Sequence, residues 1–142
     1  MLEVVLLLNT LWFAMGFYVF YFRRSVFAKV MVPNRDHRDN DAYAALIETG
    51  RFMGGFNLAL SLFNLGLVFN LGGLNADSQW AIILIFNALA HVSQFAGNVP
   101  MALQNRRGGG LWNVFTGVML QIFVIDLVLT IFNGGLAIAL LL

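Results

Sequence analysis

Four long apolar blocks constrain the fold more than any other feature of the chain. They cover residues of about 2–22, 44–69, 79–103 and 111–133, and the last block continues with little polarity to residue 142. Each block approaches or exceeds the roughly 20 residues that a helix needs to cross a bilayer. A single segment inside lipid satisfies its backbone groups only as a helix. The sequence therefore predicts an all-α integral membrane four-helix bundle, built as one transmembrane domain over residues 1–142.

Composition agrees with this prediction and removes several classes of function. Hydrophobic residues make up 60% of the chain and charged residues 11%, whereas about 25% of a soluble domain is charged. The net charge is +1 and no basic stripe occurs, so we expect no nucleic-acid partner. Without cysteine the chain cannot form disulfides or thiolate metal sites, and no metal-binding motif occurs. We therefore expect no metal site.

The basic residues indicate how the bundle is oriented. Seven of the eight Lys and Arg residues lie in two connections: five in residues 23–43 and two in residues 104–110. Residues 70–78 contain none. Because cytoplasmic loops are enriched in Lys and Arg, both basic connections are predicted to be cytoplasmic. The termini and the 70–78 loop are then predicted to lie on the opposite side. The aromatic residues in the second half of the first block, Trp12 among them, suit the headgroup level at the cytoplasmic end.

Polar residues recur inside the apolar blocks at helical spacing. Asn87, His91, Gln94 and Asn98 are separated by four, three and four positions, which places them on one face of a helix. A polar face avoids lipid, so we expect it to line the interior of the bundle. A second such face combines three residues of the second block: Asn57, Ser61 and Asn64.

Ionisable residues within membrane spans are costly and mark candidate functional sites. Glu48 and Arg51 are three residues apart in the cytoplasmic third of the second block and can pair. Together with Gln94 and Asn98 they are predicted to form one polar layer inside the bundle. A structural ion pair and side chains that reach the membrane surface are the alternatives.

His91 and Asp126 are predicted to form a second layer, near the middle of the membrane. Both fall there when the helices are laid out at about 1.5 Å per residue. A carboxylate at that depth must be protonated, paired or hydrated. His91 can be its partner, a proton carrier, or a single axial ligand to a haem or chlorophyll-type pigment. Structural and functional roles both stay open for Asp126.

Small residues predict one close helix contact. Gly50 and Gly54 form a GxxxG step in the second block, which permits two helices to approach closely. Packing within the bundle is favoured over dimerisation.

The sequence leads to two principal functional hypotheses. The first is a small accessory or scaffold subunit that packs beside other membrane subunits, or beside its own copies, in a larger complex. The second is a bundle that binds or transports a quinone, a lipid or a pigment ligated by His91. An intramembrane enzyme is not expected, because no nucleophile or metal set can be assembled. The ligand-binding or proton-carrying candidates are Glu48, Arg51, His91, Gln94, Asn98 and Asp126.

Overall fold

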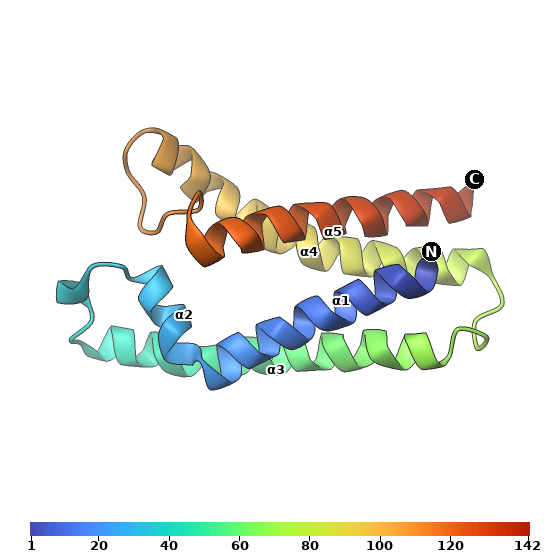
Figure 1. The fold of residues 1–142 in the computed structure, drawn as a ribbon, viewed down its shortest axis with the longest axis horizontal. Helices are drawn as coiled ribbons and strands as arrows, with labels where there is room; N and C mark the ends of the chain where they lie inside the picture. The colour runs from blue at the N-terminus through green and yellow to red at the C-terminus, as the bar shows by residue number, and fades with distance from the viewer.

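The structure is a computed structural model that describes all of residues 1–142, and it is helical throughout except for short connections (Figure 1). Four helical segments are long and apolar enough to cross a membrane: Leu2–Phe22, Asp41–Phe69, Asp77–Arg106 and Gly117–Leu141. The first consists of α1 (Leu2–Phe17) and a π-helical turn, η1 (Tyr18–Phe22). The other three are α3, α4 and α5. The predicted all-α chain with four helices of membrane-spanning length is confirmed.

The long helices are arranged as two pairs (Figure 1). α1 packs along α3, and α4 packs along α5. The pairs lie close together near the two chain termini and diverge toward the opposite end. Both basic connections lie at the divergent end, whereas the termini and the 70–76 loop lie at the other. The two basic connections therefore share one end of the molecule.

Polar side chains make direct hydrogen bonds between the two helix pairs. Outside these, the largest buried apolar cluster combines Val5 of α1, Ala81 and Leu84 of α4, and Ala137 of α5. Lipid is as apolar as such side chains, so apolar burial drives helix association only weakly in a membrane. Interhelical hydrogen bonds and close packing supply the specific contacts instead.

The contact between α3 and η1 depends on two glycines. A Cβ atom on Gly50 would lie 2.7 Å from the carbonyl oxygen of Phe20, and one on Gly54 would lie 2.8 Å from the Cβ of Tyr21. Real side chains do not tolerate such distances, so these positions require glycine. The predicted GxxxG packing within the bundle is confirmed.

The first connection, predicted as a loop over residues 23–43, contains a short helix, α2 (Arg24–Met31), and a 3₁₀ turn, η2 (Arg35–His37). Arg38 stabilises the end of α2 by donating to the carbonyls of Val32 and Pro33 at 2.7 and 2.9 Å. Carbonyl groups at the end of a helix lack intrahelical partners, and a basic side chain satisfies them. The connection therefore contains helical structure that the sequence analysis did not anticipate.

Three helix boundaries lie outside the predicted apolar blocks because polar residues extend the helices. α3 begins at Asp41 rather than residue 44, since Asn40 accepts from the backbone N–H of Tyr43 at 2.9 Å and caps the helix. α4 runs from Asp77 to Arg106 rather than from 79 to 103. Hydropathy finds the apolar part of such a helix and misses its polar ends.

The start of the last helix was predicted incorrectly. α5 begins at Gly117 rather than near residue 111. Gly108 and Gly110 adopt φ angles of 81° and 107°, which end α4 and turn the chain. Asn105 then accepts from the backbone N–H of Val114 at 2.8 Å and folds the following residues back onto the end of α4. Residues 111–116 therefore form a structured loop rather than the first turns of α5.

Candidate functional site

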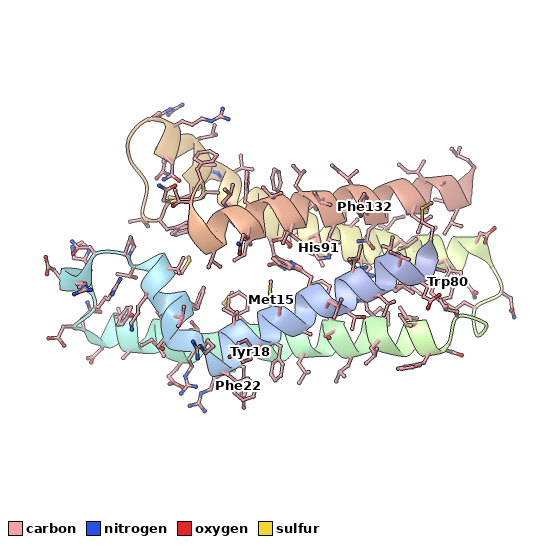
Figure 2. The ribbon with its side chains drawn as sticks, in the orientation of Figure 1. Met15, Tyr18, Phe22, Trp80, His91 and Phe132 are labelled. Atoms are coloured by element: carbon pink, nitrogen blue, oxygen red, sulfur yellow. The ribbon has the colours of Figure 1, made fainter.

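His91 of α4 and Asp126 of α5 form the centre of a buried polar network. The distance between His91 Nδ1 and Asp126 Oδ1 is 3.0 Å, and protein covers both side chains completely. Figure 2 shows His91 where the two helix pairs meet. The predicted proximity of these two residues is confirmed, and their functional role stays a prediction.

Helix α1 supplies the rest of the shell around the pair. Asn9 Oδ1 lies 3.1 Å from His91 Nε2, and Trp12 Nε1 donates to Asp126 Oδ1 at 2.9 Å. The ring of Phe13 stacks on the imidazole, with centroids 4.8 Å apart and planes 13° apart. Positions 9, 12 and 13 share one face of α1 because they are three and four residues apart. One face of α1 thus closes the site.

Asn133 of α5 fixes the direction of the hydrogen bonds. Its Nδ2 donates to the carbonyl of Leu129 at 2.8 Å and to Asn9 Oδ1 at 3.0 Å. Asn9 Nδ2 returns a hydrogen bond to Asn133 Oδ1 at 2.9 Å. The Leu129 carbonyl can only accept, so it determines which atom of Asn133 is nitrogen, and Asn133 in turn orients Asn9. The atom of Asn9 that faces His91 is consequently an oxygen.

The orientation of Asn9 determines the hydrogen on His91. Because Nε2 faces an oxygen acceptor, it must carry a hydrogen. Nδ1 then faces Asp126 Oδ1, and without a second proton two lone pairs would oppose each other at 3.0 Å. One proton must therefore lie between Nδ1 and Oδ1. Whether it is bound to nitrogen or to oxygen, the pair as a whole is neutral, which lowers the cost of burying it.

Both ring nitrogens of His91 are engaged, and one carboxyl oxygen is not. A metal-centred pigment would need a free ring nitrogen, so this arrangement does not offer His91 as an axial ligand. Asp126 Oδ2 is buried without a hydrogen-bond partner. The site therefore retains one unused acceptor beside the shared proton.

A second amide pair joins α3 to α4. Asn64 and Asn87 donate to each other at 3.1 and 3.0 Å, and both are fully buried. Asn64 Nδ2 also donates to the carbonyl of Leu60 at 2.9 Å, which orients it as the Leu129 carbonyl orients Asn133. These bonds satisfy buried amides across the helix interface and fit the structural role that is common for such groups.

Glu48 and Arg51 pair as predicted, but they do not lie in the predicted buried layer. Glu48 Oε2 is 2.7 Å from Arg51 Nε, and its Oε1 is 3.2 Å from Arg24 Nε. The side chains of Glu48 and Arg51 are 54% and 52% exposed, so protein does not bury them. The prediction of a buried layer with Gln94 and Asn98 was wrong, because Glu48 faces Arg24 at the start of α2 rather than α4.

The polar face of α4 divides into two parts. Asn87 and His91 are buried between the helix pairs, whereas Gln94 and Asn98 are only partly buried. Asn98 Oδ1 accepts from Trp112 Nε1 at 3.2 Å and so holds the loop before α5. The side chain of Gln94 makes no hydrogen bond to protein.

A narrow cleft lies beside the buried network and opens at the molecular surface. Its cavity volume is about 50 Å³, and a figure of about 410 Å³ is reached only when the open space at its mouth is included. Its position on the divergent side follows from its lining, because Gln94 comes after His91 in α4 and Ile122 comes before Asp126 in α5. In Figure 2, Met15 extends from α1 toward the space between the pairs. The walls comprise Trp12, Met15, Gly16, Val19, Phe20, Asn57, Gln94, Val118 and Ile122.

The sequence analysis assigned no role in the site to three residues of the network. Asn9 and Asn133 are polar positions that were not among the predicted candidates, and Trp12 was assigned to the headgroup level. Asn133 lies seven residues after Asp126, a spacing that places both on one helix face. That spacing was the available signal for Asn133, whereas nothing in the first block indicates the partners of Asn9 or Trp12.

No protein-family model, curated protein or solved structure matches the chain. Function is therefore inferred from the geometry of its own side chains.

Proposed function

We propose that this chain is an integral membrane protein that binds a small, mainly apolar molecule in the cleft between its two helix pairs. The observation that carries the proposal is the cleft itself, which is walled by all four long helices and combines apolar side chains with the amides of Asn57 and Gln94. Ligand sites are commonly concave and apolar with a few polar groups that orient the ligand. Every wall residue belongs to a helix of membrane-spanning length, so the molecule would enter from the lipid phase.

The buried His91–Asp126 pair lies next to this cleft. Trp12 lines the cleft and also donates to Asp126. The indole therefore separates the bound molecule from the shared proton of His91 and Asp126. This arrangement suits a lipid or a quinone better than a pigment that needs an axial ligand.

Site-resolved photolabelling tests the proposal. The protein is reconstituted in phosphatidylcholine vesicles and irradiated with a diazirine analogue of decanol, and labelled residues are mapped by mass spectrometry. We expect saturable labelling at Met15, Val19 and Ile122. Phe56 and Phe86 line an open apolar groove on the outer surface of α3 and α4, and their labelling should rise without saturation. Labelling of the three cleft residues that never saturates contradicts the proposal.

The proposed orientation places residues 23–43 and 104–110 in the cytoplasm. Both connections lie at one end of the molecule, which agrees with the charge distribution. The chain has no native cysteine, so single cysteines can be placed at Arg35 and Asn75. A membrane-impermeant thiol reagent should label these two positions from opposite sides. Labelling of both from the same side contradicts this orientation.

The accessory-subunit hypothesis stays a prediction. It expects a stoichiometric membrane partner, or a defined assembly of copies, after purification in mild detergent. A monodisperse single chain that retains saturable labelling in the cleft supports the binding function alone.

A further inference from the structure

Three charged side chains meet where the first two membrane-spanning segments approach the basic end of the molecule. Glu48 Oε2 lies 2.7 Å from Arg51 Nε, and Glu48 Oε1 accepts from Arg24 Nε at 3.2 Å. Arg24 begins α2 just after the first span ends, and no charged residue follows Arg51 in α3. The boundary cluster of Arg24, Glu48 and Arg51 therefore lies where the apolar part of each helix begins.

Exposed tyrosines place the boundary cluster at the level of the lipid headgroups. Tyr18 and Tyr21 are exposed, and they precede Arg24 in the chain by six and three residues. Tyrosine is enriched at membrane–water interfaces, where its ring contacts apolar lipid and its hydroxyl contacts water. A group bound by the cluster would therefore lie beside the headgroups rather than in the hydrocarbon core.

The ion pairs leave the outer ends of both guanidinium groups free. They join Glu48 to the Nε atom of each arginine. Arg24 Nη1 also donates to the carbonyl of Tyr21 at 3.3 Å, whereas Arg24 Nη2 and both terminal nitrogens of Arg51 have no acceptor in the protein. One carboxylate neutralises only one of two guanidinium groups, so the cluster keeps a positive charge. Guanidinium groups with free N–H donors are well suited to bind phosphate.

Gly50 holds the two halves of the boundary cluster together. A Cβ atom on Gly50 would lie 2.9 Å from the Cβ of Arg24 and 2.7 Å from the carbonyl oxygen of Phe20. The absence of a side chain lets α2 begin directly against α3, so that Arg24 reaches Glu48. The position of Arg24 thus follows from backbone packing and not only from the reach of a mobile surface side chain.

Apolar helix surface begins next to the boundary cluster. Phe52 is exposed and lies one helical turn after Glu48 on α3. Gly55 lies one turn after Arg51, and a Cβ atom there would meet nothing within 4 Å. This exposed part of α3 is open to a neighbouring acyl chain. An occupant that combines an anionic headgroup with acyl chains would contact both the arginines and this apolar surface.

The charge distribution of the whole chain favours an anionic occupant at this end. All eight Lys and Arg residues lie toward the divergent end, together with four of the seven acidic residues. Of the other three acidic residues, Asp126 is buried, and Glu3 and Asp77 lie at the opposite end. Basic residues beside a membrane attract anionic lipids, and the attraction extends over about a Debye length.

We propose that the boundary cluster binds the phosphate group of an anionic phospholipid whose acyl chains lie along α3 beside Phe52. Arg24 and Arg51 donate to the phosphate oxygens through their free terminal nitrogens, and Glu48 holds the two guanidinium groups in place. A zwitterionic phospholipid carries the same phosphate, but its ammonium group cancels the attraction to a positive cluster. This site is separate from the cleft and does not depend on the function proposed for it.

Two photoactivatable lipids test the preference for an anionic headgroup. Phosphatidylglycerol and phosphatidylcholine, each with a diazirine in one acyl chain, are added at equal mole fraction to phosphatidylcholine vesicles that contain the protein. We expect phosphatidylglycerol to label Phe52 about fivefold more strongly, the effect of one basic residue near the membrane surface. It should label Ile82, an exposed residue near the opposite end of the molecule, no more strongly. Equal labelling of Phe52 by the two lipids overturns the proposal.

The deacylated headgroup distinguishes a lipid from a free anion. Glycerophosphoglycerol carries the same phosphodiester as phosphatidylglycerol but has no acyl chains. An excess of this compound in the buffer should leave the labelling of Phe52 unchanged. Its displacement of the phosphatidylglycerol probe would overturn the lipid as the occupant of the site.

Two arginine variants distinguish a defined site from general electrostatic attraction. Arg51→Gln removes one guanidinium group, while Glu48 retains Arg24 as its partner. Arg107→Gln makes the same change of charge at an exposed position in the other basic connection. We expect Arg51→Gln to remove most of the preference for phosphatidylglycerol at Phe52 and Arg107→Gln to leave it nearly unchanged. An equal effect of both variants, or no effect of Arg51→Gln, overturns the site. The comparison of lipids on the wild-type protein decides the headgroup preference even if a variant fails to fold.

Discussion

Asn9 and Asn133 exchange two amide hydrogen bonds, of 2.9 and 3.0 Å, and thereby join the first long helix to the last. Asn64 and Asn87 make the same reciprocal contact between α3 and α4. The two asparagine pairs differ in one respect, because Asn9 Oδ1 also lies within hydrogen-bonding distance of His91 Nε2, at 3.1 Å. This difference leads to opposite expectations for their removal.

Double replacement should separate the two amide pairs. Each single Asn→Leu change strands a buried amide and should lower the free energy of unfolding by about 1–3 kcal/mol. Asn64→Leu with Asn87→Leu should recover most of that loss, since both partners become apolar together. Asn9→Leu with Asn133→Leu should not recover, because His91 loses its acceptor. Unfolding in detergent measures the unfolding free energies of both double-mutant cycles. Similar recovery of both double variants contradicts the linkage of Asn9 to His91.

Asp126→Asn should disturb the site although the amide has the shape of the acid. Trp12 needs an acceptor at the Oδ1 position, while a neutral His91 with hydrogen on Nε2 needs a donor there. An amide group supplies only one of the two, so we expect a loss of about 1–3 kcal/mol in unfolding free energy.

Trp12→Phe should partly rescue Asp126→Asn, because it removes the competing donor and lets the amide NH₂ face His91 Nδ1. Trp112→Phe is the control, since Trp112 bonds to Asn98 instead. Full tolerance of Asp126→Asn alone, or equal rescue by both tryptophan changes, would show that the hydrogen-bond directions are misassigned.

Nitrogen NMR can observe the hydrogen on His91 directly. His37 is the only other histidine, so a His37→Gln variant labelled with ¹⁵N-histidine reports His91 alone. We expect a directly bonded hydrogen on Nε2, as the orientation of Asn9 requires. An Nε2 without a hydrogen would contradict the series of hydrogen bonds that runs from Leu129 through Asn133 and Asn9.

Adjacent glycines in α3 offer a matched test of helix packing. Gly54→Ala would place a methyl group against Tyr21, whereas a Cβ atom on Gly55 would meet nothing within 4 Å. We expect Gly54→Ala to lower the unfolding free energy by about 1–3 kcal/mol through overpacking. Gly55→Ala should be neutral or stabilising by up to about 1 kcal/mol, because alanine favours the helix. Thermal unfolding in detergent compares them, and equal midpoints contradict the close contact with η1.

The sequence predicted the four long helices because each must satisfy its own backbone within an apolar block. It also predicted that His91 and Asp126 meet, because both fall near mid-membrane and each belongs to a polar helix face that is directed inward. It did not predict Asn9 or Trp12 as their partners. Their roles depend on the rotation of α1 relative to α4 and α5, which a nearly uniform apolar segment does not encode in its pattern.

The error at Glu48 and Arg51 has a different physical origin. Their depth along α3 was placed near the cytoplasmic end, but depth alone does not determine which neighbour a side chain faces. Helix α2 brings Arg24 to Glu48, and the sequence analysis did not anticipate a helix in this connection. The buried layer was consequently assigned to α4 instead.

Filling the cleft with a bulky side chain tests its role as a binding site most directly. Ile122 lines the cleft and Leu127, on the same helix, is exposed outside it. The measurement is the half-saturating concentration of the decanol probe for labelling at Val19 in Ile122→Trp and Leu127→Trp proteins of equal thermal stability. We expect Ile122→Trp to raise it about tenfold or more, since overpacking a site costs on the order of 1–3 kcal/mol, and Leu127→Trp to leave it unchanged. Unchanged saturable labelling in Ile122→Trp would contradict binding in this cleft.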